Sequence, residues 1–315
     1  MREVTIGSRK SKLALIQTNW VIEQLEKQPN APRFHIKEIE TKGDKNLQVS
    51  LAKFGGQGVF LEELEEQLLN GDVDMAVHSL KDMPVQLKKG LTIACIPKRE
   101  DHRDAYIAKG HVPFSELPKG AVIGTSSVRR AAQLLQKRPD IRTKWIRGPI
   151  DSRLEQLETG HFDAIILAVA GMKRLHIVEG NVTEYLPDDH FIPAMGQGAL
   201  AIECRQDDTE IKELLATIHD EDTNKAVTTE RLFLDAFHEG EQAPIGGYAY
   251  VVDDLIYLRG MVISLDGQTM IQHEATGEDP KVLAKEVASH LIERGAMDII
   301  QKVNKELSHD DFSTK

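Results

Sequence analysis

The 315-residue sequence predicts an α/β protein of two lobes, each with a mainly parallel sheet, and a small α+β third domain. Two observations predict the lobes: short apolar strands alternate with amphipathic helices through residues 1–97, and the alternation begins again near residue 100. The third observation is a change to hairpin signals in the last part of the chain. We expect domain 1 to hold residues 1–97 and 198–218, domain 2 residues 100–192, and domain 3 residues 220–315.

Domain 1 is expected to begin with a strand at Glu3–Ile6 and a helix at Lys12–Glu26. In that helix, Leu13, Ile16 and Trp20 share one face, which is typical of a helix that covers a sheet. Four further elements are expected: strands at Phe34–Glu40, Asp74–Val77 and Leu91–Ile96, and an acidic helix at Val59–Leu69.

Domain 2 repeats the alternation. Its strands are expected at Ala105–Ala108, Ala121–Ile123, Lys144–Ile146 and Asp163–Ala168, and its helices at Val128–Gln136 and from Ile150. After a polar stretch, Gly196–Glu203 combines a glycine-rich turn with a buried strand. We expect this strand to return the chain to domain 1.

Domain 3 has the pattern of an antiparallel sheet with helices. Asp253-Asp254 and Asp266-Gly267 provide turns, and the second is a strong hairpin signal. The expected elements are a helix at Thr223–Phe237, strands at Tyr248–Val252, Leu255–Ser264 and Thr269–Glu274, and helices at Pro280–Glu293 and Ala296–Leu307.

The composition is that of a globular protein, with 41% hydrophobic and 28% charged residues. A net charge of −11 disfavours nonspecific binding to nucleic acid or to an anionic membrane, and no apolar run approaches the roughly 18 residues that span a bilayer. The twelve histidines lack metal-ligand spacing, and Cys95 and Cys204 lie in apolar runs typical of core residues. We expect the chain to start with a strand instead of a signal peptide, because its N-terminus lacks a basic-then-apolar pattern. We expect a cytoplasmic monomer with no metal site.

Basic turns follow four of the expected strands. They are Gly7–Ser11, His78–Asp82, Gly124–Arg130 and Arg147–Arg153. In open α/β sheets, ligands bind beyond the carboxyl ends of the strands, where turns expose backbone N–H groups. Because the chain is acidic overall, these turns predict a site for a polyanion, and Asp82 adds a carboxylate to it.

Arg129 and Arg130 lie in the first turn of their expected helix, where cations oppose the helix dipole. They are either solvated surface arginines or ligands of an anion that Ser126, Ser127 and the helix N-terminus also bind. We favour the anion, because it accounts for cations at an unfavourable position. The same reasoning applies to further cations of the basic turns: Arg9, Lys10, Arg147 and Arg153.

Asp82 follows Lys81 and has two interpretations. It belongs either to an ordinary surface ion pair or to an acid/base group at the polyanion site. Neither Gly55–Gly58 nor Gly196–Gly198 is followed by Lys-Ser/Thr, so neither is a nucleotide-binding P-loop. The residues alone predict a two-lobed anion-binding protein with a candidate acid/base, and a phosphate- or sulfate-binding protein is an alternative.

Six short motifs occur in a fixed order along nearly the whole chain. They are Thr41–Asp44, His78–Asp82, Gly124–Arg130, Ile146–Leu154, Ala170–Arg174 and Gly196–Ala199. Together they resemble the motifs of the porphobilinogen deaminase (hydroxymethylbilane synthase) family. The resemblance implies two lobes like those of periplasmic binding proteins and a small third domain.

The resemblance also implies an activity: four porphobilinogen molecules are joined head to tail, with release of ammonia, to give the linear tetrapyrrole hydroxymethylbilane. The family's cofactor is a dipyrromethane primer held by a thioether to a cysteine, and its partners are porphobilinogen and linear pyrrole oligomers. Asp82 matches the family's catalytic aspartate, which would aid loss of the amine and stabilise the cationic intermediate. The residues that would bind the acetate and propionate groups are Arg9, Ser11, Ser79, Lys81, Thr125, Ser126, Ser127, Arg129, Arg130, Arg147, Arg153 and Arg174.

The sequence departs from the family at three positions. Glu241 replaces the cysteine that attaches the cofactor, Gln57 replaces a lysine, and Pro149 replaces an asparagine. An ester to Glu241 would solvolyse where a thioether persists, because the pyrrole stabilises the departing cation. Two hypotheses follow: a hydroxymethylbilane synthase with altered primer handling, and a homologue that binds a pyrrole or another polycarboxylate without turnover.

Overall fold

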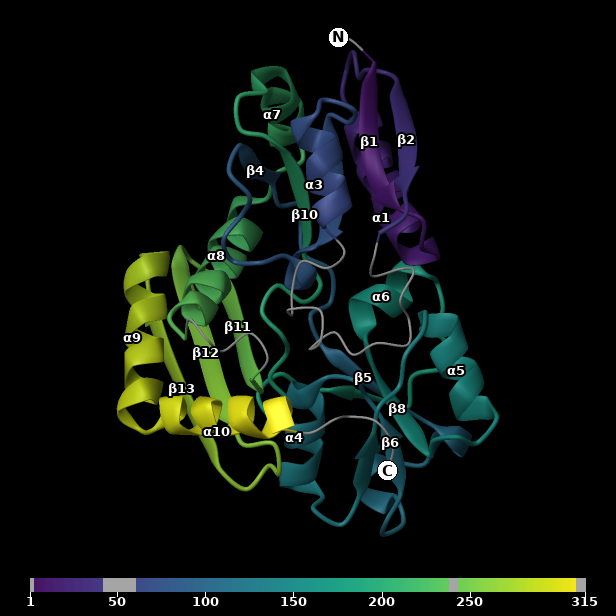
Figure 1. The fold of residues 1–315 in the computed structure, drawn as a ribbon, viewed down its shortest axis with the longest axis vertical. Helices are drawn as coiled ribbons and strands as arrows, with labels where there is room; N and C mark the ends of the chain where they lie inside the picture. The colour runs from purple at the N-terminus through teal and green to yellow at the C-terminus, as the bar shows by residue number, and fades with distance from the viewer. Residues whose placement is uncertain (1–2, 42–60, 238–242, 310–315) are drawn as a thin grey trace. The chain divides into compact units, whose positions relative to one another are not determined.

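The structure is a computed structural model, in which the chain forms two compact units (Figure 1). The residues it describes are 3–41, 61–237 and 243–309. Unit 1 contains residues 1–101 and 196–224, and unit 2 contains residues 102–195 and 225–315. The chain therefore passes from one unit to the other three times.

Unit 1 is built on a five-stranded sheet with the strand order β2-β1-β3-β10-β4. Its strands are β1 (Val4–Arg9), β2 (Phe34–Ile39), β3 (Met75–Ser79), β4 (Leu91–Cys95) and β10 (Leu200–Arg205). β1 runs parallel to β2 and β3, whereas β10 runs antiparallel to both of its neighbours, β3 and β4. The buried strand after Gly196 thus returns the chain to this sheet, as predicted.

Helices cover both faces of this sheet. On one face lie α1 (Lys12–Glu26) and α7 (Thr209–Ala216), in a core that includes Leu25. On the other face lies α3 (Glu62–Leu69), whose Leu64 packs in a cluster with Ala76 of β3. A sheet covered on both faces buries its inner strands, which accounts for the apolar sequences of β3 and β10.

α1 buries a face next to the expected one. Its buried residues are Ala14, Gln17, Thr18, Val21 and Leu25, whereas Leu13, Ile16 and Trp20 are only partly buried. The two polar side chains bind to the strands: Thr18 Oγ1 donates to Ser8 Oγ over 3.0 Å, and Gln17 Nε2 donates to Ser79 Oγ over 3.0 Å. These hydrogen bonds satisfy polar groups that would otherwise be costly to bury, and they fix α1 to the ends of β1 and β3.

Unit 2 contains a second sheet with the same pattern, in the order β7-β6-β8-β5-β9. β6 runs parallel to β7 and β8, and β5 runs antiparallel to β8 and β9. The helix α4 packs in one core cluster, and α5 and α6 pack in another. The elements are β5 (Asp104–Ala108), η3 (Lys109–His111), η4 (Phe114–Glu116), β6 (Val122–Gly124), α4 (Val128–Lys137), β7 (Arg142–Lys144), α5 (Ile150–Glu158), β8 (Ala164–Ala168), α6 (Val169–Arg174) and β9 (Glu184–Leu186).

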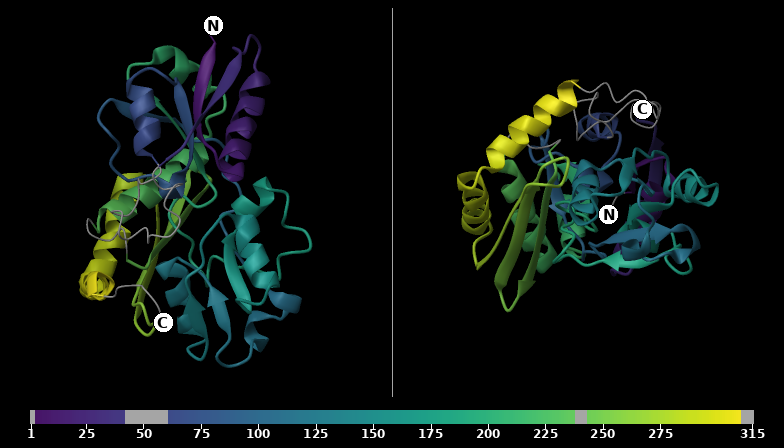
Figure 2. Two further views of the ribbon diagram at one scale, coloured as in Figure 1. Left: turned by 45° about the vertical axis from the view of Figure 1, so that its right-hand side comes forward. Right: turned by 90° about the horizontal axis from the view of Figure 1, so that it is seen from below.

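The rest of unit 2 is an antiparallel three-stranded sheet, β11-β12-β13, with α9 and α10 on one side of it (Figure 2). Its hairpin turn reaches α4: a Cβ on Gly267 would lie 2.5 Å from the backbone nitrogen of Gln136, and Gly267 has a φ of +74°. Glycine is required there both by the backbone conformation and by the close approach. The elements are α8 (Glu221–Asp235), which belongs to unit 2 from Lys225 onward, β11 (Ile245–Val252), β12 (Leu255–Ile263), β13 (Met270–Gly277), α9 (Pro280–Glu293) and α10 (Ala296–His309).

The predicted fold class is confirmed: two α/β sheets of mainly parallel character and a small antiparallel sheet with helices. The strand expected at Lys144–Ile146 is wrong, because β7 spans Arg142–Lys144 and Ile146 is buried beyond its end. The division into three domains stays a prediction, since residues 225–315 share a compact unit with residues 102–195. Within the described parts of the chain, no helix is long and apolar enough to cross a membrane.

Candidate functional site

In unit 1, two of the predicted basic turns lie at the same edge of the sheet. β1 and β3 are parallel neighbours, so Arg9 at the end of β1 and Ser11 just after it lie at the edge where the turn follows β3. Ser11 caps α1, because its Oγ accepts a hydrogen bond of 3.3 Å from the backbone nitrogen of Ala14. Ser79 is held by Gln17 of the same helix. Both serines therefore fix the backbone of the basic turns.

The turn after β3 is a 3-10 helix, η2 (Leu80–Asp82), and the Gly196–Gly198 segment packs against it. A Cβ on Gly196 would lie 3.2 Å from the backbone nitrogen of Lys81, and Lys81 Nζ donates to Gln197 Oε1 over 3.3 Å. Gln197 is buried, whereas Asp82 is exposed to solvent. A closely packed glycine turn thus supports the segment that presents the candidate acid/base.

In unit 2, the turn after β6 carries the predicted serines and arginines. Thr125 is buried, and its Oγ1 accepts from the backbone nitrogen of Ser127 over 3.2 Å. Ser127 is the N-cap of α4, with its Oγ 3.4 Å from the backbone nitrogen of Arg130, and Ser126 is exposed. The helix N-terminus expected from the sequence is therefore present, with one serine used to cap it.

Arg129 and Arg130 are buried and share a carboxylate that the sequence did not lead us to expect, Asp104. Asp104 Oδ2 accepts from Arg129 Nη2 over 2.9 Å, and Asp104 Oδ1 accepts from Arg130 Nε and Nη2 over 3.0 and 2.6 Å. Each arginine also donates to a backbone carbonyl, that of Ile192 or Ile166. The interpretation of these two residues as solvated surface arginines is therefore wrong, and their placement at a helix N-terminus does not by itself require an external anion.

Two further arginines complete a cationic group that we call the arginine cluster: Arg129, Arg130, Arg147 and Arg153. Burial, followed by the nearby positive charges of Arg130 and Arg147, lowers the pKa of Arg153 to about 10. Arg153 Nε donates to the carbonyl of Gly148, and the Arg147 guanidinium lies 4.8 Å from the centre of the Trp145 ring. Mutual repulsion of these buried and half-buried cations favours a bound anion. Arg174, at the end of α6, is half-buried.

The two cysteines do not provide a reactive thiol. Both lie in the core of unit 1, and burial raises the pKa of Cys95 to about 12 and that of Cys204 to about 11. A thiolate is the nucleophilic form, and it is disfavoured at both positions. Glu241 and Gln57 lie outside the described residues. Pro149 is the N-cap of α5 and makes no side-chain cap there.

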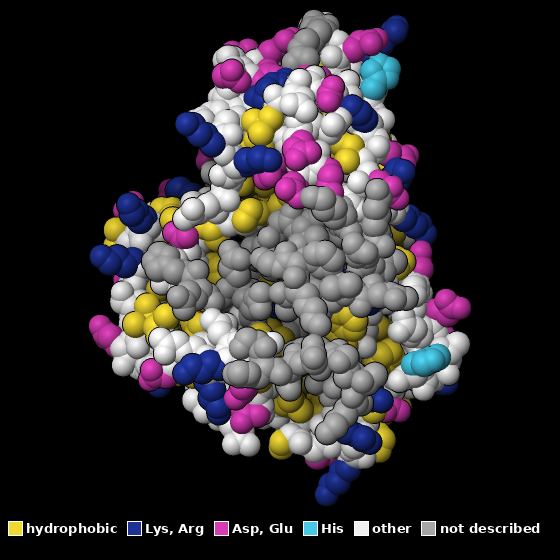
Figure 3. Space-filling model, viewed as in Figure 1, with side chains coloured by type: hydrophobic (Ala, Val, Ile, Leu, Met, Phe, Trp, Pro, Cys, Tyr) yellow, Lys and Arg dark blue, Asp and Glu magenta, His cyan; other side chains and the backbone are white. Residues whose placement is uncertain are grey.

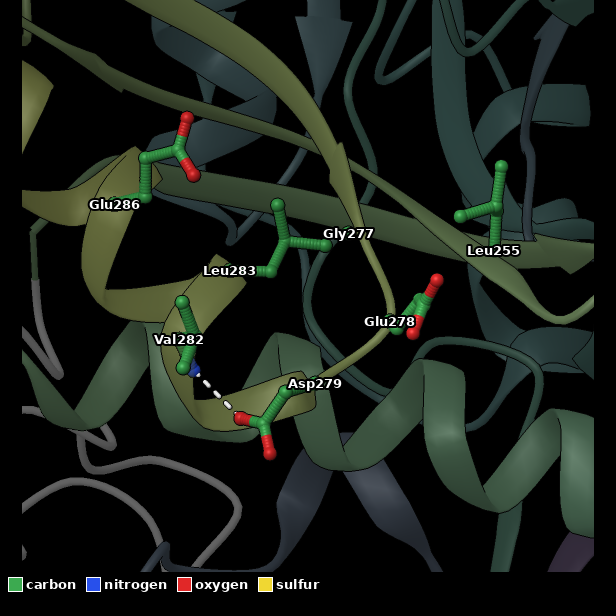
Figure 4. A pocket seen from close by; sticks show the side chains of 7 residues that line it. All are labelled: Leu255, Gly277, Glu278, Asp279, Val282, Leu283 and Glu286. Carbon is green, nitrogen blue, oxygen red and sulfur yellow. Dashed lines mark hydrogen bonds between the residues drawn. The ribbon is translucent and has the colours of Figure 1, made fainter.

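An open pocket of about 420 Å³ lies elsewhere in unit 2, where β13 leads into α9 (Figure 4). Glu278, Asp279 and Glu286 line it, and Asp279 Oδ1 accepts from the backbone nitrogen of Val282. None of the predicted site residues that the structure describes lines it, and its carboxylates would repel a polycarboxylate. On the face shown in Figure 3, basic and acidic side chains of the described residues are interspersed.

Two family models match the chain. The first is described as porphobilinogen deaminase, dipyromethane cofactor binding domain, and matches residues 4–213; the second is the porphobilinogen deaminase C-terminal domain and matches residues 224–293. The porphobilinogen deaminase of Bacillus pumilus (strain SAFR-032) is 52% identical over 309 residues, which are 98% of this chain and 99% of that protein. That of Bacillus subtilis (strain 168) is 51% identical over 311 residues, with the same coverage of each.

Among solved structures, a YaeC-family lipoprotein of Enterococcus faecalis is 12% identical, with a TM-score of 0.42 over 70% of this chain and 92% of the other. An arginine-specific periplasmic binding protein of Salmonella typhimurium is 13% identical, with a TM-score of 0.38 over 69% and 92%. Likenesses this low carry no argument about the chain. The two family models and the relatives with about half of their residues identical do: the chain belongs to the porphobilinogen deaminase family.

Proposed function

We propose that the chain carries the porphobilinogen-binding and proton-transfer groups of a hydroxymethylbilane synthase. The observation that carries the proposal is the arginine cluster: Arg129 and Arg130 share the carboxylate of Asp104, and Arg153 lies near the positive charges of Arg130 and Arg147, within a chain of net charge −11. Each porphobilinogen bears an acetate and a propionate, and arginine binds carboxylates through two parallel hydrogen bonds. Arg9 and Lys81 of unit 1 and Arg174 of unit 2 would bind further carboxylates.

The proposed reaction needs a proton-transfer group and a stabiliser of positive charge. The bond between the aminomethyl carbon and its nitrogen breaks with both electrons leaving on nitrogen, which departs as ammonia. The α-carbon of a second pyrrole then forms a bond to the cationic methylene carbon and loses its proton. Asp82 would guide protonation of the leaving amine and accept hydrogen bonds from the pyrrole N–H groups while they share the positive charge. Its exposed position on η2 suits both roles.

The carboxylates of a dipyrromethane suit the cations of this chain, but the chain lacks the cysteine to which the family attaches this cofactor. When bound, it would supply the acceptor pyrrole carbon, and its carboxylates would lie against the arginine cluster. The sequence has two cysteines, and both are buried with raised pKa values. We therefore propose that no thioether forms and that any primer is held without a lasting covalent bond. This observation favours the second candidate function, a homologue that binds pyrrole polycarboxylates without turnover.

One experiment separates the two candidates. Porphobilinogen consumption and intact mass are measured for the parent chain, for Glu241→Cys, and for Glu241→Gln as a control that adds no thiol. If Glu241→Cys alone gains a dipyrromethane adduct and turnover, the chain is a deaminase that lacks its attachment group. If the parent turns over porphobilinogen at its sequence mass, it is a synthase that works without a covalent primer. If none of the three binds or consumes porphobilinogen, the proposed function is wrong.

The remaining expectations are also proposals. We propose that the chain acts as a monomer in the cytoplasm, and light scattering on the purified protein tests the monomer. A phosphate- or sulfate-binding protein is distinguished by Asp82→Asn, because that variant should lose porphobilinogen turnover whereas simple anion binding should be unaffected.

A further inference from the structure

We propose that Asp104 is a positioning residue of the carboxylate-binding site, which holds Arg129 and Arg130 in place without neutralising the arginine cluster. Asp104 is fully buried, and its two oxygens accept three hydrogen bonds from the two guanidinium groups. The inference rests on the proposed function, since it assigns the cluster to the carboxylates of a pyrrole.

The sheet topology places Asp104 at the edge where ligands bind. β5 runs antiparallel to β8, so the first residue of β5, Asp104, pairs with the last residue of β8, Ala168. The carboxyl ends of the parallel strands β6 and β8 lie at that same edge, and α4 begins there. An antiparallel strand in an otherwise parallel sheet thus delivers a carboxylate to the turn that carries the two arginines.

The orientation of both arginines is fixed from several sides. Arg129 donates through Nη2 to Asp104 and through Nη1 to the carbonyl of Ile192, over 2.9 and 2.6 Å. Arg130 donates through Nε and Nη2 to Asp104 and through Nη1 to the carbonyl of Ile166. Because Asp104 accepts hydrogen bonds from both arginines, its loss would free one edge of each guanidinium group at once.

The charge balance shows that Asp104 does more than neutralise its partners. Burial lowers the pKa of Arg129, and the charge of Asp104 opposes this effect. Asp104 brings one negative charge to the two positive charges of Arg129 and Arg130, so these three side chains together keep a net positive charge. One carboxylate therefore orders two arginines and still leaves the site attractive to an anion.

Asp104→Asn separates the two effects of the carboxylate. If Asp104 only reduced the positive charge, removing its charge would strengthen the binding of a dicarboxylate pyrrole. If it positions the arginines, binding should weaken, because the amide group of asparagine turns N–H donors toward the N–H donors of one arginine. The two roles predict changes of opposite sign in the dissociation constant of the pyrrole. A loss of stability alone does not change this constant as long as the protein is folded.

The test is the dissociation constant of porphobilinogen, measured by calorimetry in an Asp82→Asn background that suppresses turnover. We expect Asp104→Asn to weaken binding about tenfold or more, as for one lost charge-assisted contact, and Asp104→Glu to restore part of it. Asp74→Asn is the matched control, since Asp74 is a buried aspartate paired with Arg205 in unit 1; it should lower stability without changing the dissociation constant.

Each outcome decides one question. Unchanged or tighter binding by a folded Asp104→Asn protein overturns the positioning role. If Asp104→Asn does not fold, the arginine Nε–H signals of Arg129 and Arg130 are compared by NMR in the Asp104→Glu protein and the parent. Altered arginine signals together with an unchanged dissociation constant in the Asp104→Glu protein overturn the role as well. If the Asp82→Asn protein binds no porphobilinogen, the proposed function fails instead.

Discussion

Gly198 offers a test of how the glycine turn supports η2. Its φ is +91°, and a Cβ added there would lie 2.4 Å from the carbonyl oxygen of Glu100. Gly71 has a similar φ of +77°, but a Cβ there would meet nothing within 4 Å. Both glycines belong to unit 1, so the pair isolates the effect of the close contact from that of the backbone conformation.

Gly198→Ala should destabilise unit 1 more than Gly71→Ala does. The left-handed conformation costs a side chain roughly 1–2 kcal/mol at either position, and a clash with backbone adds about 1–3 kcal/mol at Gly198 alone. The entropic gain in the unfolded chain is common to both variants and cancels. We therefore expect the free energies of unfolding to differ by about 1–3 kcal/mol.

Urea unfolding in a Trp145→Phe background measures this difference, because the remaining tryptophan, Trp20, lies on α1 in unit 1. Equal losses for the two variants would show that the Glu100 carbonyl moves aside freely, and the turn would not be rigid. Since Gln197 binds Lys81, Gly198→Ala should also weaken porphobilinogen binding, whereas Gly71→Ala should not.

Two further predictions concern titratable groups of unit 1. Burial, followed by the nearby charge of Glu203, raises the pKa of Glu65 above 4.5, so the folded state holds this proton more tightly and stability falls as the pH rises past that value. Glu65→Gln should therefore raise the urea midpoint at pH 7 and change it little at pH 4; a larger gain at pH 4 would contradict the assignment. The native protein should resist alkylation by iodoacetamide at pH 8, because both thiols are buried with pKa values of about 12 and 11. Rapid labelling before urea is added would show that a thiol is available to attach a primer.

Much of the fold was predictable because its signals are local. The α1 and α9 helices span the residues expected, Lys12–Glu26 and Pro280–Glu293, since an N-cap and an apolar periodicity mark each. The three polar residues of β7 carry no such signal. Because Trp145 and Ile146 beside them are apolar, the strand was expected to include these two residues, which lie beyond its end. A short polar strand is defined by its pairing with β6, which lies outside the local sequence.

The site was predictable in its cations but not in their internal partner. The sequence shows that Arg129 and Arg130 oppose the helix dipole, and this conflict correctly identified the Gly124–Arg130 turn as part of the arginine cluster. Asp104 lies 25 residues before Arg129, and only the antiparallel course of β5 brings the two together. The available signal was a charged residue directly before an apolar strand, which alone does not identify a partner.

The place of β10 in the first sheet has a consequence for synthesis of the protein. β10 lies between β3 and β4, yet it is made about a hundred residues after them. When residue 101 leaves the ribosome, no strand yet joins β4 to the rest of its sheet. The edges of β3 and β4 that pair with β10 therefore stay exposed until residues 200–205 have been made. A nascent chain stopped at residue 101 should therefore remain sensitive to protease, and protection of unit 1 should appear only once β10 has emerged.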